Sequence, residues 1–380
     1  MGGSASLEKL VSPSPMLNWQ QLKNAYSGKR VFLTGHTGFK GAWLLYILHQ
    51  MGAEIKGYAL PPEHKQDLYN QLAGGNLCHS VFADIGDAEK LREELVSFQP
   101  DFVFHLAAQA LVRRSYRQPL DTFRSNTMGT AYLLEALREV LGPATAVIIT
   151  TDKVYENDER GTAFPESAPL GGYDPYSASK AAAEIVISSY RRSFFPLAGK
   201  AVHQKGIYAL RAGNVIGGGD FSEDRLIPDM VRAIESGQPV ILRNPQSVRP
   251  WQHVLEPLVA YLILGAQAAA GKNLPPALNI GPDRTDERTV AKVASAFYAA
   301  FGKTDAPKIA LEPAMHEAGL LMLDNTLIKE ALGWKPQLTA EEAIRWTADW
   351  YAGTAPAAEK CEMQTMAYFE RVNLLANHER

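Results

Sequence analysis

Two residues with acid–base chemistry stand one helical turn apart in the second half of the chain. Tyr176 and Lys180 belong to the segment YSASK, which opens a helix predicted over 177–190. Side chains four residues apart lie on the same face of a helix. A tyrosine loses its proton near pH 10, so a tyrosine base at neutral pH needs roughly 4 kcal/mol of anion stabilisation, for which a neighbouring ammonium is a suitable source. The alternative is a pair of surface side chains, which any helix can carry.

A group of polar residues precedes this pair in the segment TTDKVY, directly after a strongly apolar strand predicted over 147–149. The carboxyl ends of strands in an open parallel sheet face the ligand crevice. Thr151, Asp152 and Lys153 are therefore candidates for a catalytic site. The alternative is a capped turn in which Thr151 and Asp152 satisfy backbone donors. The order of the motifs along the chain favours the catalytic interpretation.

A glycine-rich loop, GHTGFKG over 35–41, follows the first predicted strand. Gly35, Gly38 and Gly41 have the spacing that lets a backbone turn tightly, approach a pyrophosphate and seat the next helix against the sheet. The N–H groups at the start of that helix would then face the anion. The alternative is a glycine-rich turn without a ligand. The position of the loop in the first strand–helix–strand unit favours a dinucleotide site.

The choice between NAD and NADP stays open at this point. An acidic residue about twenty positions after the loop would bind the ribose hydroxyls of NAD. Here the second strand runs into ALPP at 59–62, and only Glu63 follows. Asp84, at the end of the third predicted strand, is expected to hold the adenine amine, with a helix cap as the alternative.

Regularly spaced apolar segments predict the sheet that would position these motifs. Strands are predicted at 31–33, 55–58, 81–83, 102–104, 147–149 and 208–210. The early spacing of just over twenty residues is typical of βαβ units. The expected fold class is α/β, a Rossmann-type doubly wound parallel sheet with a smaller, interleaved C-terminal substrate-binding region. Further helices are predicted at 38–51, 255–270, 285–302 and 340–351.

The predicted domain organisation has four parts. Gly, Ser and Pro without a period indicate a loose N-terminal tail over 1–28, ahead of a dinucleotide-binding domain over 29–213. Turn-rich segments then indicate a mainly substrate-binding region over 214–354. A C-terminal helix or tail is expected over 355–380.

Composition excludes several classes of protein. The 380 residues are 46% hydrophobic and 21% charged, with a net charge of -3, so no general basic field would hold nucleic acid or an anionic membrane. Affinity for phosphate must therefore be local. Two isolated cysteines, Cys78 and Cys361, cannot form a disulfide framework or a Cys-rich zinc site, and no metal is expected. No signal-peptide or membrane-spanning segment is evident, which predicts a cytoplasmic protein.

With HLAAQ at 105–109, RAGNVIGGGD at 211–220 and RPWQHV at 249–254, these motifs together resemble the extended short-chain dehydrogenase/reductase family. The resemblance extends from about Lys29 to Trp350 and is closest to the CDP-glucose 4,6-dehydratase branch. It implies that NAD oxidises C4 of a nucleotide-bound glucose, that water leaves across C5 and C6, and that the hydride returns to C6. The expected substrate is CDP-glucose, and the expected product is the 4-keto-6-deoxy sugar.

The resemblance also implies roles for individual residues. Tyr176 would remove the 4-hydroxyl proton, Lys180 would support the phenolate and ribose, and Thr151 would bond to the 4-oxygen. Asp152 would protonate the departing 6-hydroxyl, and Lys153 would take the C5 proton. The cofactor would contact Gly35, His36, Thr37, Gly38, Phe39, Lys40, Gly41, Asp84, Ile85, Leu106, Ala107, Ala108, Asn126, Thr150, Tyr176 and Lys180. The substrate would contact Gln109, Arg113, Asn214, Arg243, Arg249 and His253, with Arg211 as a further candidate for its phosphates.

Lys153 stands where the dTDP-sugar dehydratases carry glutamate. A lysine is a base only when neutral, so a dry pocket with other cations must lower its pKa while raising that of Asp152. If Lys153 stays charged, it would instead stabilise the enolate. His36 occupies a loop position where a small residue would let the backbone approach the pyrophosphate more closely, which predicts loose retention of NAD.

Three alternatives compete with this interpretation. Another sugar-nucleotide 4,6-dehydratase would share the motifs. A 4-epimerase would share the glycine loop and the Tyr-Lys pair but would not need Asp152 and Lys153. A non-catalytic cofactor-binding scaffold would not need the Tyr-Lys pair. In the family, helices corresponding to 119–141 and 177–192 pair across a dimer, so a homodimer or homotetramer is expected.

Overall fold

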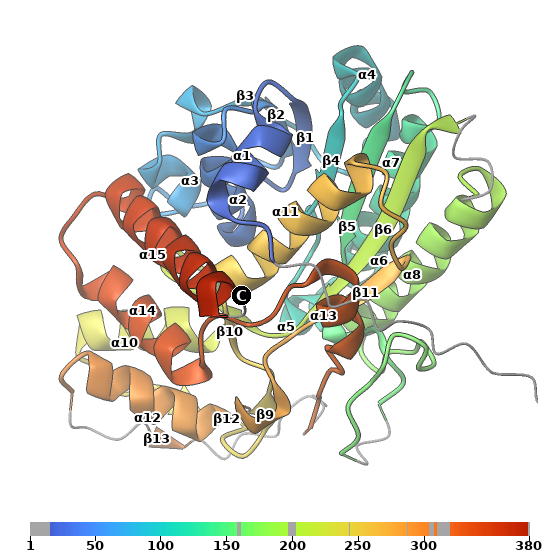
Figure 1. The fold of residues 1–380 in the computed structure, drawn as a ribbon. Helices are drawn as coiled ribbons and strands as arrows, with labels where there is room; N and C mark the ends of the chain where they lie inside the picture. Colours follow the sequence, from blue (N-terminus) through green and yellow to red (C-terminus); the bar gives the residue numbers. More distant parts are fainter. Residues whose placement is uncertain are drawn as a thin grey trace, which may run out of the picture.

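The computed structural model describes residues 16–157, 161–196, 203–242, 244–286, 288–303, 308–309 and 320–378. Its centre is a seven-stranded parallel sheet in the order β11-β6-β5-β4-β1-β2-β3 (Figure 1). The strands are β1 Arg30–Thr34, β2 Glu54–Ala59, β3 His79–Phe82, β4 Phe102–His105, β5 Ala144–Ile149, β6 Lys205–Ala212 and β11 Ala277–Ile280. The six strands predicted from the sequence are all confirmed, and β11 joins them from the C-terminal region.

Helices cover both faces of the sheet. On one face, Val31, Leu33 and Phe104 share a hydrophobic core with α1, α2, α11 and α15. On the other, Phe32, Val103 and Ile148 pack with α4, α7 and α8. Two covered faces explain why the strands are apolar throughout. These helices are α1 Trp19–Tyr26, α2 Phe39–Gln50, α4 Ala88–Phe98, α7 Gly129–Leu137, α8 Pro175–Ser193, α11 Leu255–Ala269 and α15 Ala357–His378.

A smaller region extends from the carboxyl ends of the strands. Its own core joins α10, α12 and α14 through Met230, Phe297 and Ile344 (Figure 1). The helices of this region are α10 Leu226–Ser236, α12 Val290–Ala300 and α14 Ala340–Ala352, and its short strands are β7 Val215–Ile216, β8 Ile241–Leu242, β9 Val248–Arg249, β10 Gln252–His253, β12 Arg288–Thr289 and β13 Lys308–Ile309. The helix α13 Thr326–Leu332 instead packs on α11 and β11, and its Ile328 and Leu332 belong to the main core. Because α11 and β11 complete the main sheet layer, the two regions are interleaved as predicted.

Short helices connect the main elements. They are α3 Leu68–Gln71, α5 Val112–Arg117 and α6 Pro119–Phe123, with single turns η1 Gly74–Asn76, η3 Asp152–Val154 and η5 Arg284–Asp286 and a π-helical turn η2 Arg124–Met128. The helix predicted over 119–141 is thus formed by α6, η2 and α7 in succession.

The chain ends differ from the prediction in one respect. Residues 1–15 of the predicted loose tail lie outside the described residues, but the following segment is not loose. It forms α1, with a capping box between Asn18 and Gln21. Leu22 and Tyr26 are buried, and the Tyr26 hydroxyl donates to the Leu262 carbonyl at 2.7 Å. At the other end, the predicted C-terminal helix is present as α15.

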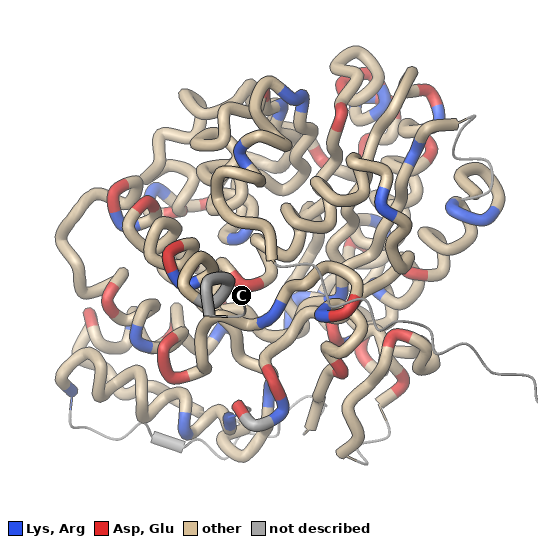
Figure 2. The backbone as a smooth tube through the Cα atoms, in the orientation of Figure 1, with Lys and Arg blue, Asp and Glu red and all other residues tan. Residues whose placement is uncertain are grey.

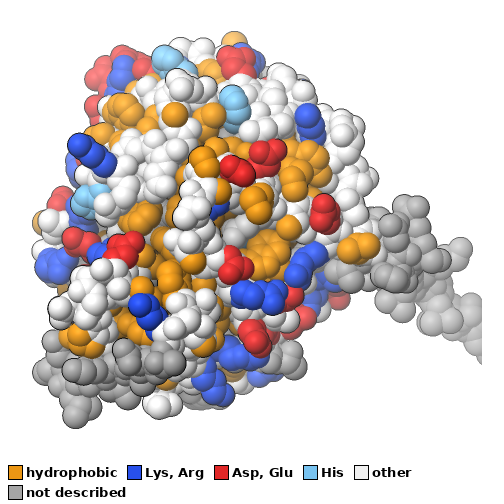
Figure 3. Space-filling model, turned by 90° about the vertical axis from the view of Figure 1, so that its left-hand side faces the viewer, with side chains coloured by type: hydrophobic (Ala, Val, Ile, Leu, Met, Phe, Trp, Pro, Cys, Tyr) orange, Lys and Arg blue, Asp and Glu red, His pale blue; other side chains and the backbone are white. Residues whose placement is uncertain are grey.

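Charges of both signs are mixed over the described chain (Figure 2). On the face shown in Figure 3, hydrophobic patches lie between scattered acidic and basic side chains. Among the helices of the described residues, none is both long and apolar enough to cross a membrane. Cys78 and Cys361 are free thiols, and the described residues hold no cluster of His, Cys, Asp and Glu that suits a metal ion.

Candidate active site

The glycine loop joins β1 to α2 at the point where the sheet order reverses. Gly35 has φ +75°, and a Cβ there would lie 2.7 Å from the Ala107 amide nitrogen. At Gly41 a Cβ would lie 1.9 Å from the Gly35 carbonyl oxygen. Both positions therefore require glycine. Gly38 caps α2 without a side-chain hydrogen bond, so the first N–H groups of this helix are left for an anion.

The side chains of the loop point in different directions. The buried ring of His36 packs under Gly57 and accepts from or donates to the Ser80 hydroxyl at 3.1 Å. Burial lowers the pKa of His36 to about 4, so the ring is neutral. The Thr37 hydroxyl donates to the Leu60 carbonyl at the end of β2. Lys40 instead enters the main cavity. The loose retention of NAD stays a prediction.

The other predicted cofactor residues surround the same switch point. Asp84 accepts from the Gly86 amide and forms an ion pair with Arg124, with 2.6 Å between the atoms. Asn126 bonds to the backbone of Gln109 and to the Ser179 hydroxyl. Around them, Ile85 packs against Gly129, Ala107 lies behind Gly35, and Leu106, Ala108 and Thr150 line the cavity.

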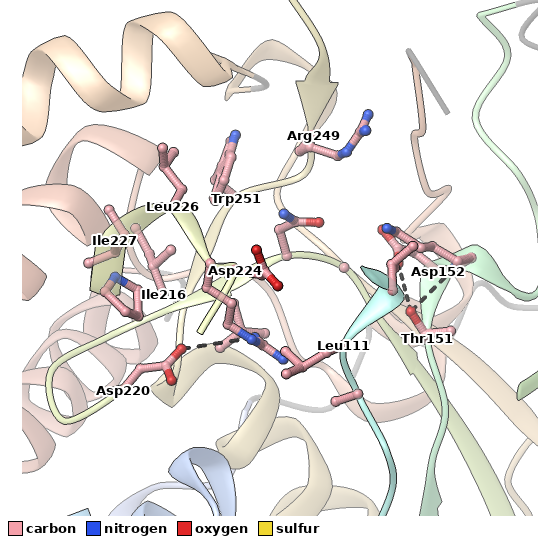
Figure 4. A pocket seen from close by; sticks show the side chains of 18 of the residues that line it. Leu111, Thr151, Asp152, Ile216, Asp220, Asp224, Leu226, Ile227, Arg249 and Trp251 are labelled. Carbon is pink, nitrogen blue, oxygen red and sulfur yellow. Dashed lines mark hydrogen bonds and ion pairs between the residues drawn. The ribbon is translucent and has the colours of Figure 1, made fainter. Parts of the chain in front are cut away.

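The cavity lies at the carboxyl ends of β1, β4, β5 and β6 and measures about 360 Å³. Figure 4 shows Thr151 and Asp152 at one end and Ile216, Leu226 and Ile227 at the other. All five predicted catalytic residues line it: Thr151, Asp152, Lys153, Tyr176 and Lys180. The structure therefore brings together two segments that the sequence analysis treated as one site.

Local structure explains how these side chains are presented. Asp174 caps α8 by accepting from the Ser177 amide, and Pro175 occupies the first helical position, which places Tyr176 in the first turn. Thr151 caps the turn η3 by accepting from the Lys153 amide. The capped turn considered as an alternative is therefore real, and it coexists with the site.

Asp152 is suited to donate a proton. Its side chain is only 1% exposed, and burial raises its pKa, although the Lys153 charge opposes the shift. The Thr151 hydroxyl donates to Oδ1 at 2.9 Å. Oδ2 has no hydrogen-bond partner among the described residues. A buried carboxyl oxygen without a partner favours the protonated form.

Tyr176 and Lys180 lie in the same dry environment. Burial raises the pKa of Tyr176 to about 12, while a hydrogen bond with Thr151 opposes the rise. Burial lowers the pKa of Lys180 to about 8, and its Nζ donates to the Ile149 carbonyl at 3.0 Å. Without bound ligands the phenol of Tyr176 is therefore protonated. Its loss of a proton near neutrality requires roughly 7 kcal/mol from bound ligands and the neighbouring cation.

The sequence analysis missed one functional candidate, Arg225, and predicted another, Lys40, only as a cofactor contact. Burial, together with the charges of Arg225 and Lys180, lowers the pKa of Lys40 to about 7. Arg225 lies 4.0 Å from Asp220, the ion pair drawn in Figure 4. Its sequence signal is weak: an arginine immediately before the amphipathic helix α10. Lys40 was predicted only as part of the glycine loop.

The cavity has the local excess of cations that a diphosphate requires. Six Lys or Arg side chains line it against four Asp, counted over the described residues. Among the predicted substrate residues, Arg113, Asn214 and Arg249 line the cavity. Arg113 is paired with Asp224 at 3.1 Å, and Arg249 is only 3% exposed. Such guanidinium groups can bind phosphate bidentately.

Three predicted substrate contacts lie elsewhere. The Gln109 side chain is engaged by Leu111 and Thr122 within its own loop. His253 is fully buried, and its ring lies edge-on to Trp43 and Trp346. Arg211 forms a buried, bidentate pair with Glu184. Their side chains meet protein groups, so they are not placed for phosphate. Arg243 lies outside the described residues.

The residues at the switch point fit a dinucleotide. The positive φ of Gly35, the space above Gly38 and the uncapped start of α2 form a cradle that a side chain would fill. Lys40, from the end of the same loop, lines the cavity together with Lys180 and Tyr176. This arrangement matches a cofactor whose pyrophosphate lies at the loop and whose reactive ring lies near the tyrosine.

The comparison with protein families decides the assignment. The model for the GDP-mannose 4,6 dehydratase family matches residues 32–347. The chain belongs to this family. The match includes the glycine loop, the Asp152 segment and the Tyr-Lys pair, so the family resemblance inferred from the motifs is confirmed.

Individual members of the dehydratase family are also similar. A CDP-glucose 4,6-dehydratase from Salmonella typhimurium is 44% identical over 336 residues, which cover 87% of this chain and 94% of the relative. A dTDP-glucose 4,6-dehydratase from Xanthomonas campestris is 29% identical and covers 84% of this chain and 92% of its own length.

Solved structures show the same fold at lower identity. The UDP-glucose 4-epimerase of Thermotoga maritima with UDP-glucose has a TM-score of 0.74 and 23% identity, covering 85% of this chain and 98% of that one. The dTDP-glucose 4,6-dehydratase of Bacillus anthracis in complex with NAD has a TM-score of 0.72 and 20% identity, covering 88% and 100%. These likenesses confirm the predicted fold class.

Proposed function

We propose that this protein is an NAD-dependent CDP-glucose 4,6-dehydratase, a hydro-lyase that forms CDP-4-dehydro-6-deoxy-D-glucose and water. The observation that carries the proposal is the single cavity in which Thr151, Asp152, Lys153, Tyr176 and Lys180 meet. The 44% identity to the Salmonella CDP-glucose 4,6-dehydratase supports cytosine as the nucleobase of the substrate. The amine and carboxyl beside the Tyr-Lys pair favour a dehydratase over a 4-epimerase.

The first half of the reaction needs a base at the 4-hydroxyl. Gly35, Gly38 and the start of α2 would hold the pyrophosphate of NAD, which supplies the acceptor for the C4 hydrogen and later returns it to C6. Tyr176 removes the 4-hydroxyl proton, and Thr151 donates a hydrogen bond to the 4-oxygen. Lys180 lowers the cost of the phenolate by its charge.

The second half needs an acid and a base at neighbouring carbons. The new ketone acidifies C5–H, and Lys153 acts on this step, either as the base that takes the C5 proton or as the cation that stabilises the enolate. A proton returns to C5 when the hydride reaches C6. Asp152 in its protonated form donates to the 6-hydroxyl, which leaves as water. The pKa of Asp152 is raised by burial, and this direction supports the role because it favours the protonated form. The cation excess of the cavity supports binding of the substrate diphosphate.

A substrate panel tests the proposal. The protein with added NAD is incubated with CDP-, dTDP-, GDP- and UDP-glucose, and the alkali-induced absorbance of a 4-keto sugar is followed. Turnover of CDP-glucose well above the others is expected. Faster turnover of another nucleotide sugar would contradict cytosine as the nucleobase of the substrate. Release of a galactose epimer without a 4-keto product would establish an epimerase. Absence of both products would contradict an enzymatic role.

We also infer a homodimer through α6, η2 and α8. Leu120, Phe123, Met128 and Ile185 are exposed large hydrophobic residues, with 83% of Leu120 and 61% of Ile185 accessible. Such apolar side chains on neighbouring helices suit a self-complementary interface. A dimer at micromolar concentration and a monomer for Ile185→Glu are expected in size-exclusion chromatography with light scattering, and a monomeric wild type would contradict the inference. The cytoplasmic location stays a prediction.

A further inference from the structure

A buried ion pair lies behind the catalytic segment. The Arg211 guanidinium of β6 donates to Glu184 of α8 through Nε at 3.0 Å and Nη2 at 2.9 Å. Glu184 is 4% exposed and Arg211 is 5% exposed. The mechanism above uses neither residue. Bidentate pairing fixes the orientation of both side chains.

This ion pair holds the catalytic segment from both of its ends. The Thr150 hydroxyl, immediately before Thr151, donates to Glu184 Oε1 at 2.6 Å. Arg211 Nη1 donates to the Tyr155 hydroxyl, two residues after Lys153, at 2.8 Å. Of the four residues between these anchors, Thr151 bonds to the 4-oxygen in the proposed mechanism, and Asp152 and Lys153 act on C6 and C5.

The same pair also fixes the helix that carries the tyrosine. Glu184 lies one turn after Lys180, whose Nζ donates to the Ile149 carbonyl at 3.0 Å. Two successive turns of α8 are thus hydrogen-bonded to the end of β5, Lys180 to Ile149 and Glu184 to Thr150. On the far side, the Tyr155 hydroxyl donates to Asn279 Oδ1 of β11 at 2.6 Å. The network therefore joins α8, β5, β6 and β11 around one catalytic turn.

We propose that Glu184 and Arg211 are positioning residues that set the catalytic turn of Asp152 and Lys153 against Tyr176 on α8. The inference rests on the proposed function, because it assigns C4 oxidation to Tyr176 on α8 and elimination to the turn that carries Asp152 and Lys153. Oxidation at C4 depends on Tyr176, whereas elimination depends on the far end of the turn. Loosening the Tyr155 anchor should therefore slow elimination more than oxidation.

Arginine is required for this role by its geometry. Its planar fork reaches Glu184 with two nitrogens and Tyr155 with the third, whereas an ammonium is a point charge that cannot hold both partners in fixed directions. A displacement of about 1 Å at a catalytic group can cost on the order of a hundredfold in rate. The expected loss on loosening the anchor is about tenfold to a hundredfold in kcat.

The test compares two Tyr→Phe variants of the full-length protein with NAD and CDP-glucose. Tyr155→Phe removes the anchor. Tyr368→Phe is the matched control, because its buried hydroxyl also donates to a buried polar group, Glu256, at 2.7 Å, but on α15 away from the cavity. Measurements are kcat, KM, melting temperature and the steady-state fraction of reduced nicotinamide from its near-ultraviolet absorbance.

Tyr155→Phe should lower kcat with little change in KM and should raise the fraction of reduced nicotinamide. Tyr368→Phe should lower the melting temperature by a comparable amount while leaving kcat and that fraction unchanged. Arg211→Lys should reproduce the kinetic effect of Tyr155→Phe, although it keeps the charge opposite Glu184. A wild type without 4-keto product would overturn the proposed function together with this inference. An active wild type, with Tyr155→Phe and Arg211→Lys matching the control, would overturn the inference alone.

Discussion

Binding of NAD should strengthen as the pH rises through about 7, because of Lys40. The amine enters the cavity from the first turn of α2 and lies close enough to Lys180 and Asp152 to feel their charges, which is the end expected for the nicotinamide. Burial and the charges of Arg225 and Lys180 together lower its pKa to about 7, although Asp152 opposes the shift. The oxidised nicotinamide ring is itself a cation, so it should bind the form of the protein in which Lys40 is neutral.

The size of the effect follows from that pKa. If only the neutral amine is compatible with binding, the apparent Kd is multiplied by about 1 + 10^(7 − pH). The factor is about 11 at pH 6 and about 1.1 at pH 8, which is a tenfold gain in affinity or about 1.4 kcal/mol. NADH lacks the ring charge and should show a weaker dependence.

Calorimetric titration of the protein with NAD and with NADH between pH 6 and 8 measures this directly. Lys40→Met keeps the length and apolar stem of the side chain and should abolish most of the dependence. Lys23→Met, on the exposed face of α1, is the control and should retain it. The pKa of Lys180 lies at about 8, close enough to contribute. If Lys40→Met keeps the full wild-type slope, the proton belongs to another group and the reasoning is refuted.

Two further substitutions test other parts of the site. Asp152→Asn should retain C4 oxidation, seen as reduction of NAD in a single turnover, while product formation falls by about 10² to 10⁴. Its melting temperature should stay close to that of the wild type, because the amide is uncharged and has the shape of the protonated carboxyl. An unchanged rate would remove Asp152 as the acid. Gly41→Ala should weaken NAD binding and cost about 1–3 kcal/mol of stability, since its Cβ would meet the Gly35 carbonyl at 1.9 Å. Gly75→Ala, whose Cβ would find its nearest atom at 3.8 Å, should change neither, and equal behaviour of the two would contradict the packing argument.

The sheet could be predicted from the sequence because its signals are local. A strand buried on both faces is a short apolar run, and a helix against the sheet, such as α2, is apolar nearly all round. The segment of α1 lacked such a signal. Its order depends on contacts such as that of Tyr26 with Leu262, 236 residues away. Sequence periodicity carries no information on a partner at that distance.

The site was predictable where a motif fixes backbone geometry, and less so where only side-chain type was available. Gly35 and Gly41 were assigned correctly to a tight turn because no other residue fits there. Arg211 and His253 have the chemistry to bind phosphate, but a long-range partner decided each case. Arg211 is paired with Glu184, and the ring of His253 packs against Trp43 and Trp346. Arg225 is the opposite case, because it was not predicted from the sequence but lines the cavity.

Burial alone does not determine how a charged group behaves in this protein. Burial lowers the pKa of Arg211, but hydrogen bonds with Glu184 and its charge raise it above the ordinary value overall. Arg211 therefore remains charged, and its two hydrogen bonds fix the orientation of Glu184. The pKa of Asp152 rises because burial outweighs the Lys153 charge, and it retains an oxygen without a hydrogen-bond partner among the described residues. Groups at the cavity are thus left close to a change of protonation, while the groups behind them are fully paired. A dehydratase needs both conditions, because the residues that exchange protons must be held in place by residues that do not.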